Sequence, residues 1–349
     1  MNWFVLRQHR KQFLAFGILL AAFAILLIPT GVHYWNTYQH ALSTCSQFAT
    51  PADPHGTCDT LDFGTLFPSN FDGLIKLAAI LGTFGLPILA GLFIGSPLIA
   101  REYEEGTDKL AWTQSVSRRK WLTTKLLWAL GFALAYGVLL AILATWWSRT
   151  PNTLMQNRFV QGHFETQGLM PTVYSLFFTA VGFMTGAWFR KTLLAFAITF
   201  GVFVVCMTSF AQWIRPHYYM TPVTVTAPMG PGNIDKKLPS GSIWITSQTI
   251  VDKNGKVYDS FDINTMPPQC QTLLREARSG EGKDIRISAN SHGADPIDDC
   301  LNKAGYRQVA KYQPAYRYWD FQRIEAGIYL GMTALAVGAT YWLVLKRDA

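Results

Sequence analysis

The chain has little charge for its length. Only 15% of its 349 residues are Asp, Glu, Lys or Arg, while 50% are hydrophobic. A soluble domain usually carries charge on about a quarter of its residues. This shortage argues against an ordinary soluble protein and favours a membrane protein.

The motifs of common catalytic sites are also missing. The sequence contains no HExxH, no CxxC and no Ser/His/Asp or Cys/His set with usable spacing. It lacks the phosphate-binding pattern GxxxxGK[ST], because the Gly-Lys pairs at 255–256 and 282–283 have neither the earlier Gly nor the following Ser or Thr. We therefore expect no enzymatic activity and no cofactor in this chain, so that energy for any work must come from another chain.

Ionisable side chains are scarce inside the apolar runs. Apart from Lys76 and Lys125, near the run ends, these runs hold almost no acidic or basic residues. Carriers driven by ion gradients generally need such groups near the bilayer midplane, so a secondary carrier is disfavoured. Lys76 is interpreted either as a charge on a substrate path or, preferably, as a side chain that reaches the interface.

Long apolar runs are abundant, and six of them have 18 or more residues: about 13–34, 74–99, 121–147, 171–189, 193–213 and 324–345. Roughly 20 helical residues cross the hydrocarbon core of a bilayer. The first run is too long for a signal-peptide core and is expected to be an uncleaved anchor. The runs predict an all-α polytopic membrane protein with six transmembrane helices. Gly182-x-x-x-Gly186 and Gly327-x-x-x-Gly331 predict close contacts between helices.

Basic residues follow the topology of these runs. The loop 36–72 contains no Lys or Arg. Basic residues instead gather in the short segments on the other side: Arg7, Arg10, Lys11, Arg101, Lys109, Arg118, Arg119, Lys120, Lys125, Arg190, Lys191, Lys346 and Arg347. By the positive-inside rule, both termini are cytoplasmic in a multi-pass protein of the cell membrane. The net charge of +8 is therefore a topology signal and does not indicate nucleic-acid binding. Residues 1–12 are expected to form an interfacial helix, or else a frayed basic tail.

The segment 215–320 is predicted to be a small α+β extracytoplasmic domain between the fifth and sixth helices. Alternating apolar residues flank Asn254-Gly255, which predicts a β-hairpin, and a more helical stretch CQTLLREARSG follows it. The chain thus divides into 1–12, 13–214, 215–320 and 321–349. His292, Asp295, Asp298 and Asp299 match no strong metal motif, so solvated loop acids are favoured over a metal site.

Five cysteines fit this topology. Cys45 and Cys58 share the first outside loop, Cys270 and Cys300 share the outside domain, and Cys206 lies in the fifth run. An oxidising exterior favours two disulfides, Cys45–Cys58 and Cys270–Cys300. Four free thiols remain the alternative.

The segment 101–126, REYEEGTDKLAWTQSVSRRKWLTTKL, is the most densely charged stretch. We expect the second helix to continue past the bilayer with its acids facing water, Gly106 to end it, and Thr107 and Ser117 to cap new helices. Leu110 and Trp112 would form an apolar face on this cytoplasmic elbow. An ordinary charged loop would explain the basic half only.

Two stretches of the sequence resemble a known family. Ala100-Arg101-Glu102-x-Glu104-x-Gly106-Thr107, Val116-Ser117-Arg118 and Lys125 match its motif, and LAWTQSVSR (110–118) resembles versions common in actinobacteria and related Gram-positive bacteria. YQPAYRYWDFQRIEAGIYL (312–330) resembles the entry to its last helix. The family is that of the permease subunits of ABC-2 type ABC transporters, and the resemblance covers the six-helix order of the whole chain.

The resemblance implies a permease with the type V exporter-like fold, coupled through residues 101–118 to a separate P-loop ATPase that holds ATP and Mg. The implied coupling residues are Arg101, Glu102, Glu104, Glu105, Gly106, Thr107, Leu110, Trp112 and Arg118. A second permease copy, identical or different, would complete the unit. A hydrophobic or amphipathic substrate (drug, antibiotic, peptide or lipid) would pass between the permeases, past Phe84, Phe93, Phe196, Phe200, Phe203 and Met207. The alternative is a membrane sensor whose outside domain binds a ligand.

Overall fold

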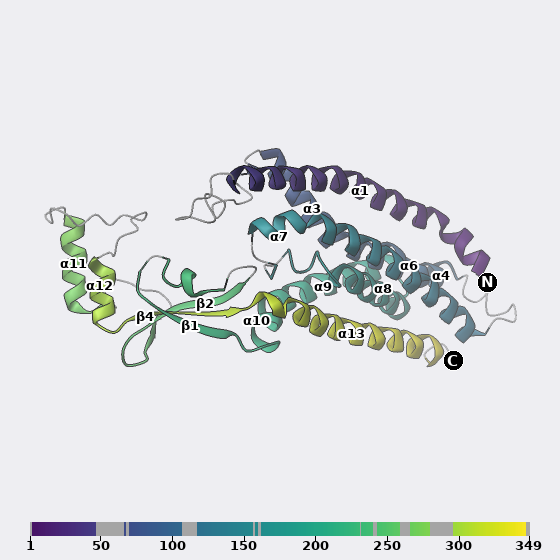
Figure 1. Cartoon of the computed structure of the whole chain (residues 1–349). Coiled ribbons are helices and arrows are strands. Elements are labelled where there is room, and N and C mark those ends of the chain that lie inside the picture. Colours follow the sequence, from purple (N-terminus) through teal and green to yellow (C-terminus); the bar gives the residue numbers. More distant parts are fainter. Residues whose placement is uncertain are drawn as a thin grey trace. The chain divides into compact units, whose positions relative to one another are not determined.

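The computed structural model describes residues 2–46, 66–67, 70–106, 117–155, 158–159, 162–230, 232–239, 243–258, 266–279 and 296–346 (Figure 1). The chain forms two compact units. The first comprises Met1–Tyr219 and Tyr318–Ala349, and the second comprises Met220–Arg317.

The first unit is a helical bundle. Its long helices are α1 (Asn2–Ser46), α3 (Asn70–Ala90) continuing through the π-turn η2 (Gly91–Gly95) into α4 (Ser96–Glu105), α6 (Arg118–Trp147), α8 (Met170–Phe189), α9 (Thr192–Ser209) continuing through the π-turn η3 (Phe210–Ile214) into α10 (Arg215–Tyr218), and α13 (Tyr318–Lys346). A short helix, α7 (Arg149–Met155), follows α6. Within the described residues, six helical stretches are long and apolar enough to cross a membrane. Each contains one of the six predicted runs, so this prediction is confirmed.

Both chain termini lie at one end of this bundle, which we call the terminal end (Figure 1). α1 starts at Asn2 and passes through Pro29 without a break. The residues expected to form a separate interfacial helix are therefore continuous with the first span.

The helix α8 is the centre of the bundle and contacts α3, α4, α6, α9 and α13. Glycines of α8 allow its backbone to lie closest to that of η2 and α4. A methyl group on Gly182 would overlap the carbonyl oxygen of Gly91, and one on Gly186 would lie 2.8 Å from the carbonyl oxygen of Ser96. The close contact predicted for Gly182 and Gly186 is thus confirmed. Gly327 and Gly331 meet nothing within 4 Å, so the contact predicted there is not made within the described chain.

Three buried hydroxyl groups join the second, fourth and fifth spans. Ser96 Oγ lies 3.2 Å from Thr199 Oγ1, which lies 2.9 Å from Thr185 Oγ1. Hydroxyls at such interfaces hold membrane helices together because lipid offers them no partner. At the end of α8, Arg190 adopts a left-handed conformation (φ 55°) and α9 begins at Thr192, so a tight turn joins the two helices.

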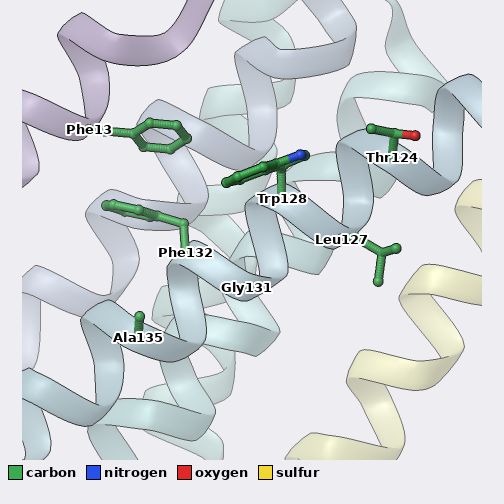
Figure 2. Close-up of a pocket in the computed structure, with 7 residues that line it drawn as sticks. All are labelled: Phe13, Thr124, Leu127, Trp128, Gly131, Phe132 and Ala135. Atoms are coloured by element: carbon green, nitrogen blue, oxygen red, sulfur yellow. The ribbon is translucent and has the colours of Figure 1, made fainter. Parts of the chain in front are cut away.

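α1 and α6 pack through aromatic side chains. The rings of Phe13 and Phe132 stack with centroids 4.7 Å apart, and Phe16 meets Tyr136 edge to face at 5.3 Å. An apolar groove runs beside these contacts along α6 (Figure 2).

The second unit contains a four-stranded antiparallel sheet in the order β1-β4-β2-β3. Its strands are β1 (Val223–Pro228), β2 (Trp244–Val251), β3 (Val257–Tyr258) and β4 (Arg307–Gln313). Short 3-10 turns lie at Asp235–Lys237 and Ala315–Arg317. β2 and β3 form the predicted hairpin.

The turn of this hairpin follows from its sequence. Gly255 has φ 82°, a conformation that costs little without a side chain. The Asp252 carboxylate accepts hydrogen bonds from the backbone N–H groups of Lys256 (3.0 Å) and Asn254 (2.8 Å). These donors hold the pKa of Asp252 below its usual value, the Lys256 N–H contributing most.

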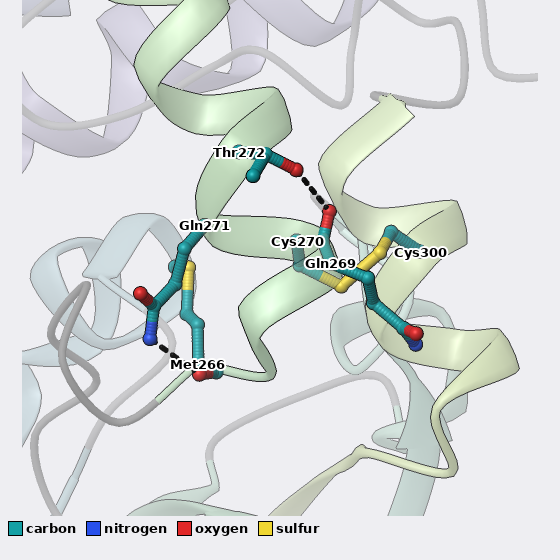
Figure 3. The surroundings of a disulfide bond; sticks show 6 residues. All are labelled: Met266, Gln269, Cys270, Gln271, Thr272 and Cys300. Atoms are coloured by element: carbon teal, nitrogen blue, oxygen red, sulfur yellow. Dashed lines mark hydrogen bonds between the residues drawn. A yellow bond between two sulfur atoms is a disulfide. The ribbon is translucent and has the colours of Figure 1, made fainter.

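The described part of the second unit also contains two helices. α11 (Pro268–Ser279) covers the predicted helical stretch, and α12 (Pro296–Lys303) precedes β4. A disulfide joins Cys270 to Cys300 (Figure 3), which confirms that predicted pair. Cys206 is unpaired, as expected. The Cys45–Cys58 prediction involves residues outside those described.

Among the described residues there is no group of His, Cys, Asp or Glu side chains that could hold a metal ion. His292 and Asp295, considered above for such a site, lie outside this part of the chain.

Removing the disulfide is expected to loosen the second unit. A cross-link over 30 residues contributes about 3–4 kcal/mol, largely by restricting the unfolded chain. The double substitution Cys270→Ser, Cys300→Ser should therefore raise amide hydrogen exchange in α11 and α12 of the full-length protein. Cys206→Ser is the control and should leave exchange there unchanged. Equal protection in the two variants would mean that packing alone holds these helices.

Candidate functional site

The candidate site begins where the second span ends, at the terminal end of the bundle. α4 stops at Gly106, whose left-handed conformation (φ 67°) lets its backbone N–H reach the carbonyl of Glu102. The side chain of Ser117 accepts a hydrogen bond from Lys120 N at 3.4 Å and caps α6. Both predicted boundaries of the elbow are confirmed.

Glu102 does not face water as we expected. Its carboxylate forms an ion pair with the ammonium of Lys125 on α6, and both side chains are buried. Lys125 also donates to the carbonyl of Leu98 at 3.4 Å and lies 4.6 Å from the ring of Trp121. A lysine inside an apolar run requires a partner. The first acid of the motif supplies it and joins α4 to α6.

Glu104 has a different partner. One of its carboxylate oxygens accepts the backbone N–H of Thr192 at 2.9 Å, and the other accepts the Thr192 hydroxyl at 2.5 Å. An acid at this position caps the start of α9 and complements its dipole. Beside it, the guanidinium of Arg190 lies 4.9 Å from the ring of Tyr103. The second acid therefore joins α4 to the fifth span.

The second and third acids are both exposed, as expected, and the third has its partner within α4. Glu105 accepts a hydrogen bond from Arg101 at 2.7 Å within the same helix, and both side chains are exposed. Arg118 is the half-buried first residue of α6. Thr107, Leu110 and Trp112 lie outside the described residues, so the apolar face of the elbow stays a prediction.

The aromatic residues expected along a substrate path are partly brought together. The π-turn η2 buries its other residues and leaves Phe93 exposed, in edge-to-face contact with Phe196 at 5.4 Å. Phe200 meets Phe203 at 6.1 Å and is exposed. Met207 is instead buried in the bundle. The side chain of Phe84 lies outside the described residues.

A second polar cluster, which the sequence analysis missed, lies at the end opposite the terminal end. We call it the Arg215 cluster and define it by Glu165, Tyr174, Arg215, Tyr219 and Glu325. The guanidinium of Arg215 contacts Glu165 at 2.7 Å and binds both carboxylate oxygens of Glu325 at 3.0 and 3.1 Å. Its side chain and both carboxylates are at most 2% exposed. The scarcity of charge within the spans was therefore overstated.

Neutral donors complete this cluster. The hydroxyls of Tyr174 and Tyr219 donate to Glu325 at 2.7 and 3.2 Å, and Gly162 N donates to Glu165 at 2.6 Å. The ring of Phe164 lies 3.9 Å from the guanidinium carbon. Burying ions is costly unless each is paired and hydrogen-bonded, and these contacts meet that need. The cluster joins α8, α10 and α13 to the loop before α8.

That loop is packed against the bundle by amide side chains. Asn152 and Gln167 exchange two hydrogen bonds of 2.7 and 3.0 Å. Gln322 on α13 accepts from Leu169 N at 3.0 Å and donates to Phe164 O at 3.1 Å. Burial lowers the pKa of His163 in this loop, the Lys76 charge lowers it further, and Glu165 opposes both. Lys76 is half-buried.

The sequence held one signal for the Arg215 cluster. Glu325 lies inside the sixth apolar run, where an acid requires a buried partner. Arg215 was instead assigned to the start of the outside domain, and Glu165 lies in a loop with no motif. The structure thus places polar links at both ends of the bundle. The Glu102 and Glu104 contacts join α4, α6 and α9 at the terminal end, and the Arg215 cluster joins α8, α10 and α13 at the other.

Comparison with known protein families agrees with this architecture. A family described as ABC-2 membrane transporter related matches residues 17–215, more than half of the chain. The match runs from within the first span to near the end of the fifth and includes the whole charged motif. No curated protein and no solved structure gives a significant match. The chain therefore belongs to the ABC-2 membrane transporter related family and is a multi-pass membrane protein of the ABC-2 permease type.

Proposed function

We propose that this chain is the membrane-spanning subunit of an ATP-driven exporter of a hydrophobic or amphipathic compound. Residues 101–118 dock on a separate ATPase subunit in the cytoplasm, and a second permease copy completes the pathway. The observation that supports this most is the bonding of the motif acids. Glu102 joins α4 to α6 and Glu104 joins α4 to α9, so a force on the elbow reaches three spans at once.

Two further features of the bundle agree with this role: exposed aromatic side chains on the moving spans, and the Arg215 cluster. The exposed Phe93 and Phe200 lie on the second and fifth spans, two of the three spans that α4 would move. The Arg215 cluster fixes the far ends of α8, α10 and α13. We assign it the role of a pivot about which the terminal end swings when the ATPase closes.

The docking prediction concerns Trp112. Buried tryptophans often dominate protein interfaces, so Trp112→Ala should weaken assembly with the ATPase by roughly 2 kcal/mol, about thirtyfold in affinity. Co-purification of the tagged permease with a co-expressed candidate P-loop ATPase measures this. Trp213→Ala is the matched control, because Trp213 is exposed at the opposite end of the fifth span.

Three outcomes decide between the hypotheses. Retention of the ATPase by the control and its loss from Trp112→Ala support the docking role. Equal retention by both variants removes Trp112 from the interface. If the unaltered chain binds no ATPase in mild detergent, the sensor hypothesis replaces the exporter.

A further inference from the structure

The groove between α1 and α6 is lined by apolar side chains of the kind that bind a hydrocarbon chain. It has a volume of about 650 Å³, and its lining is Phe13, Thr124, Leu127, Trp128, Gly131, Phe132 and Ala135. Figure 2 shows Phe13 of α1 beside Phe132 and Trp128 of α6, with Gly131 between the α6 side chains. Thr124 satisfies its own hydroxyl by donating to the carbonyl of Lys120 at 2.8 Å. The groove therefore offers an occupant apolar surface and almost no hydrogen bonds.

Positive charge stands at one mouth of this groove. On α6, Lys120, Thr124, Gly131 and Ala135 recur at helical spacing and so form one stripe. Lys120 is exposed, one turn before the groove begins. On α1, the exposed Arg10 precedes Phe13 by three residues. Within the described chain, no carboxylate forms an ion pair with Arg10 or Lys120.

The length of the groove matches one leaflet. From Thr124 to Ala135 the helix rises roughly 17 Å, and half of a bilayer's hydrocarbon core is about 15 Å. When the apolar lining of the groove lies at the level of the acyl chains, Arg10 and Lys120 therefore lie at the level of the lipid headgroups. Lysine and arginine near helix ends reach this level readily.

We propose that this groove binds an acyl chain of an anionic phospholipid, whose phosphate is held by Lys120 and Arg10. The site requires only that the bundle spans a bilayer, so it stands independently of the exporter proposal. A second permease copy is a poor occupant. Related by an axis along the membrane normal, it would bring its own Lys120 and Arg10 to the same level, and like charges would meet.

Native mass spectrometry of the purified full-length chain tests this site, with phosphatidylglycerol and phosphatidylcholine of identical acyl chains as probes. We expect the anionic lipid to bind at least fivefold more tightly, since each basic residue near the surface is worth about 1 kcal/mol. Lys120→Gln should lower that preference about fivefold, with a smaller effect on phosphatidylcholine, because its choline cation already neutralises the phosphate. Arg119→Gln is the control. It removes the same charge one residue outside the stripe and should change neither the preference for the anionic lipid nor the binding of phosphatidylcholine.

Gly131→Leu tests the groove itself. A Cβ at Gly131 has nothing within 4 Å, so the new side chain enters the groove without backbone strain and should lower binding of both lipids at least fivefold. Gly327→Leu, at an equally open helical glycine, should leave binding unchanged. Equal affinity of the unaltered chain for the two lipids, or no effect of Lys120→Gln, overturns the headgroup assignment. Efficient disulfide cross-linking of Leu127→Cys between two permeases in membranes overturns the lipid as occupant.

Discussion

Replacing Arg215 with methionine is expected to lower the stability of the bundle by about 3–5 kcal/mol, because it leaves buried carboxylates without a counter-charge. Glu165 and Glu325 both depend on this guanidinium, and neither is exposed. The loss should appear as a lower thermal unfolding midpoint in detergent and as less monodisperse protein after extraction. It would be the largest single effect among the substitutions considered for this chain.

A triple substitution separates charge from packing. Arg215→Met together with Glu165→Gln and Glu325→Gln removes all three charges while leaving acceptors for Tyr174 and Tyr219. Neutral replacements of whole buried ion clusters are often tolerated, so most of the stability should return. Arg323→Met is the matched control, since Arg323 forms an exposed pair with Asp320 that contributes little. If Arg215→Met behaves like this control, the cluster cannot be the pivot.

Glu102→Ala is expected to be the next most damaging change, at about 3 kcal/mol. The substitution strands the ammonium of Lys125, whose side chain is 4% exposed. Glu105→Ala, which removes a motif acid paired in water, should cost well under 1 kcal/mol. Thermal unfolding of the two variants side by side measures the difference between a buried and an exposed acid of the same motif.

The double variant Glu102→Ala, Lys125→Met links this pair to function. Removing both charges should restore most of the stability but not the polar link between α4 and α6. With the ATPase bound, we expect normal ATP hydrolysis and reduced transport per ATP in proteoliposomes. Full transport per ATP by this stable double variant would show that the pair only holds the fold.

Local sequence signals predicted the fold well where the cause was local. Gly106 ends α4 and Ser117 begins α6 because cap residues act within one helical turn. Asn254-Gly255 predicted the hairpin for the same reason. The six spans followed from run length alone, since a bilayer leaves few alternatives for such runs.

The candidate site depended on contacts that no local pattern specifies. Glu104 meets Thr192 across 88 positions, and Arg215 meets Glu325 across 110. Because Glu102 follows the end of an apolar run, we expected its side chain to face water. In the structure it is instead buried against α6, where Lys125 is its partner. Lys125 and Glu325 each needed a partner of opposite charge, and this need would have indicated a polar contact at each end of the bundle. It would not have identified the partners, Glu102 and Arg215.

The central position of α8 constrains how the chain enters the membrane. Its apolar window is 72% buried by protein, against at most 53% for any other span, and its mean hydropathy of 1.3 is the lowest of the six. The turn of Arg190 and Lys191 leaves it no slack to insert apart from α9. The insertion machinery must therefore release α8 and α9 together as a hairpin. Because α13 is synthesised more than a hundred residues later, the flank of α8 that packs against α13 stays uncovered in the nascent chain until then.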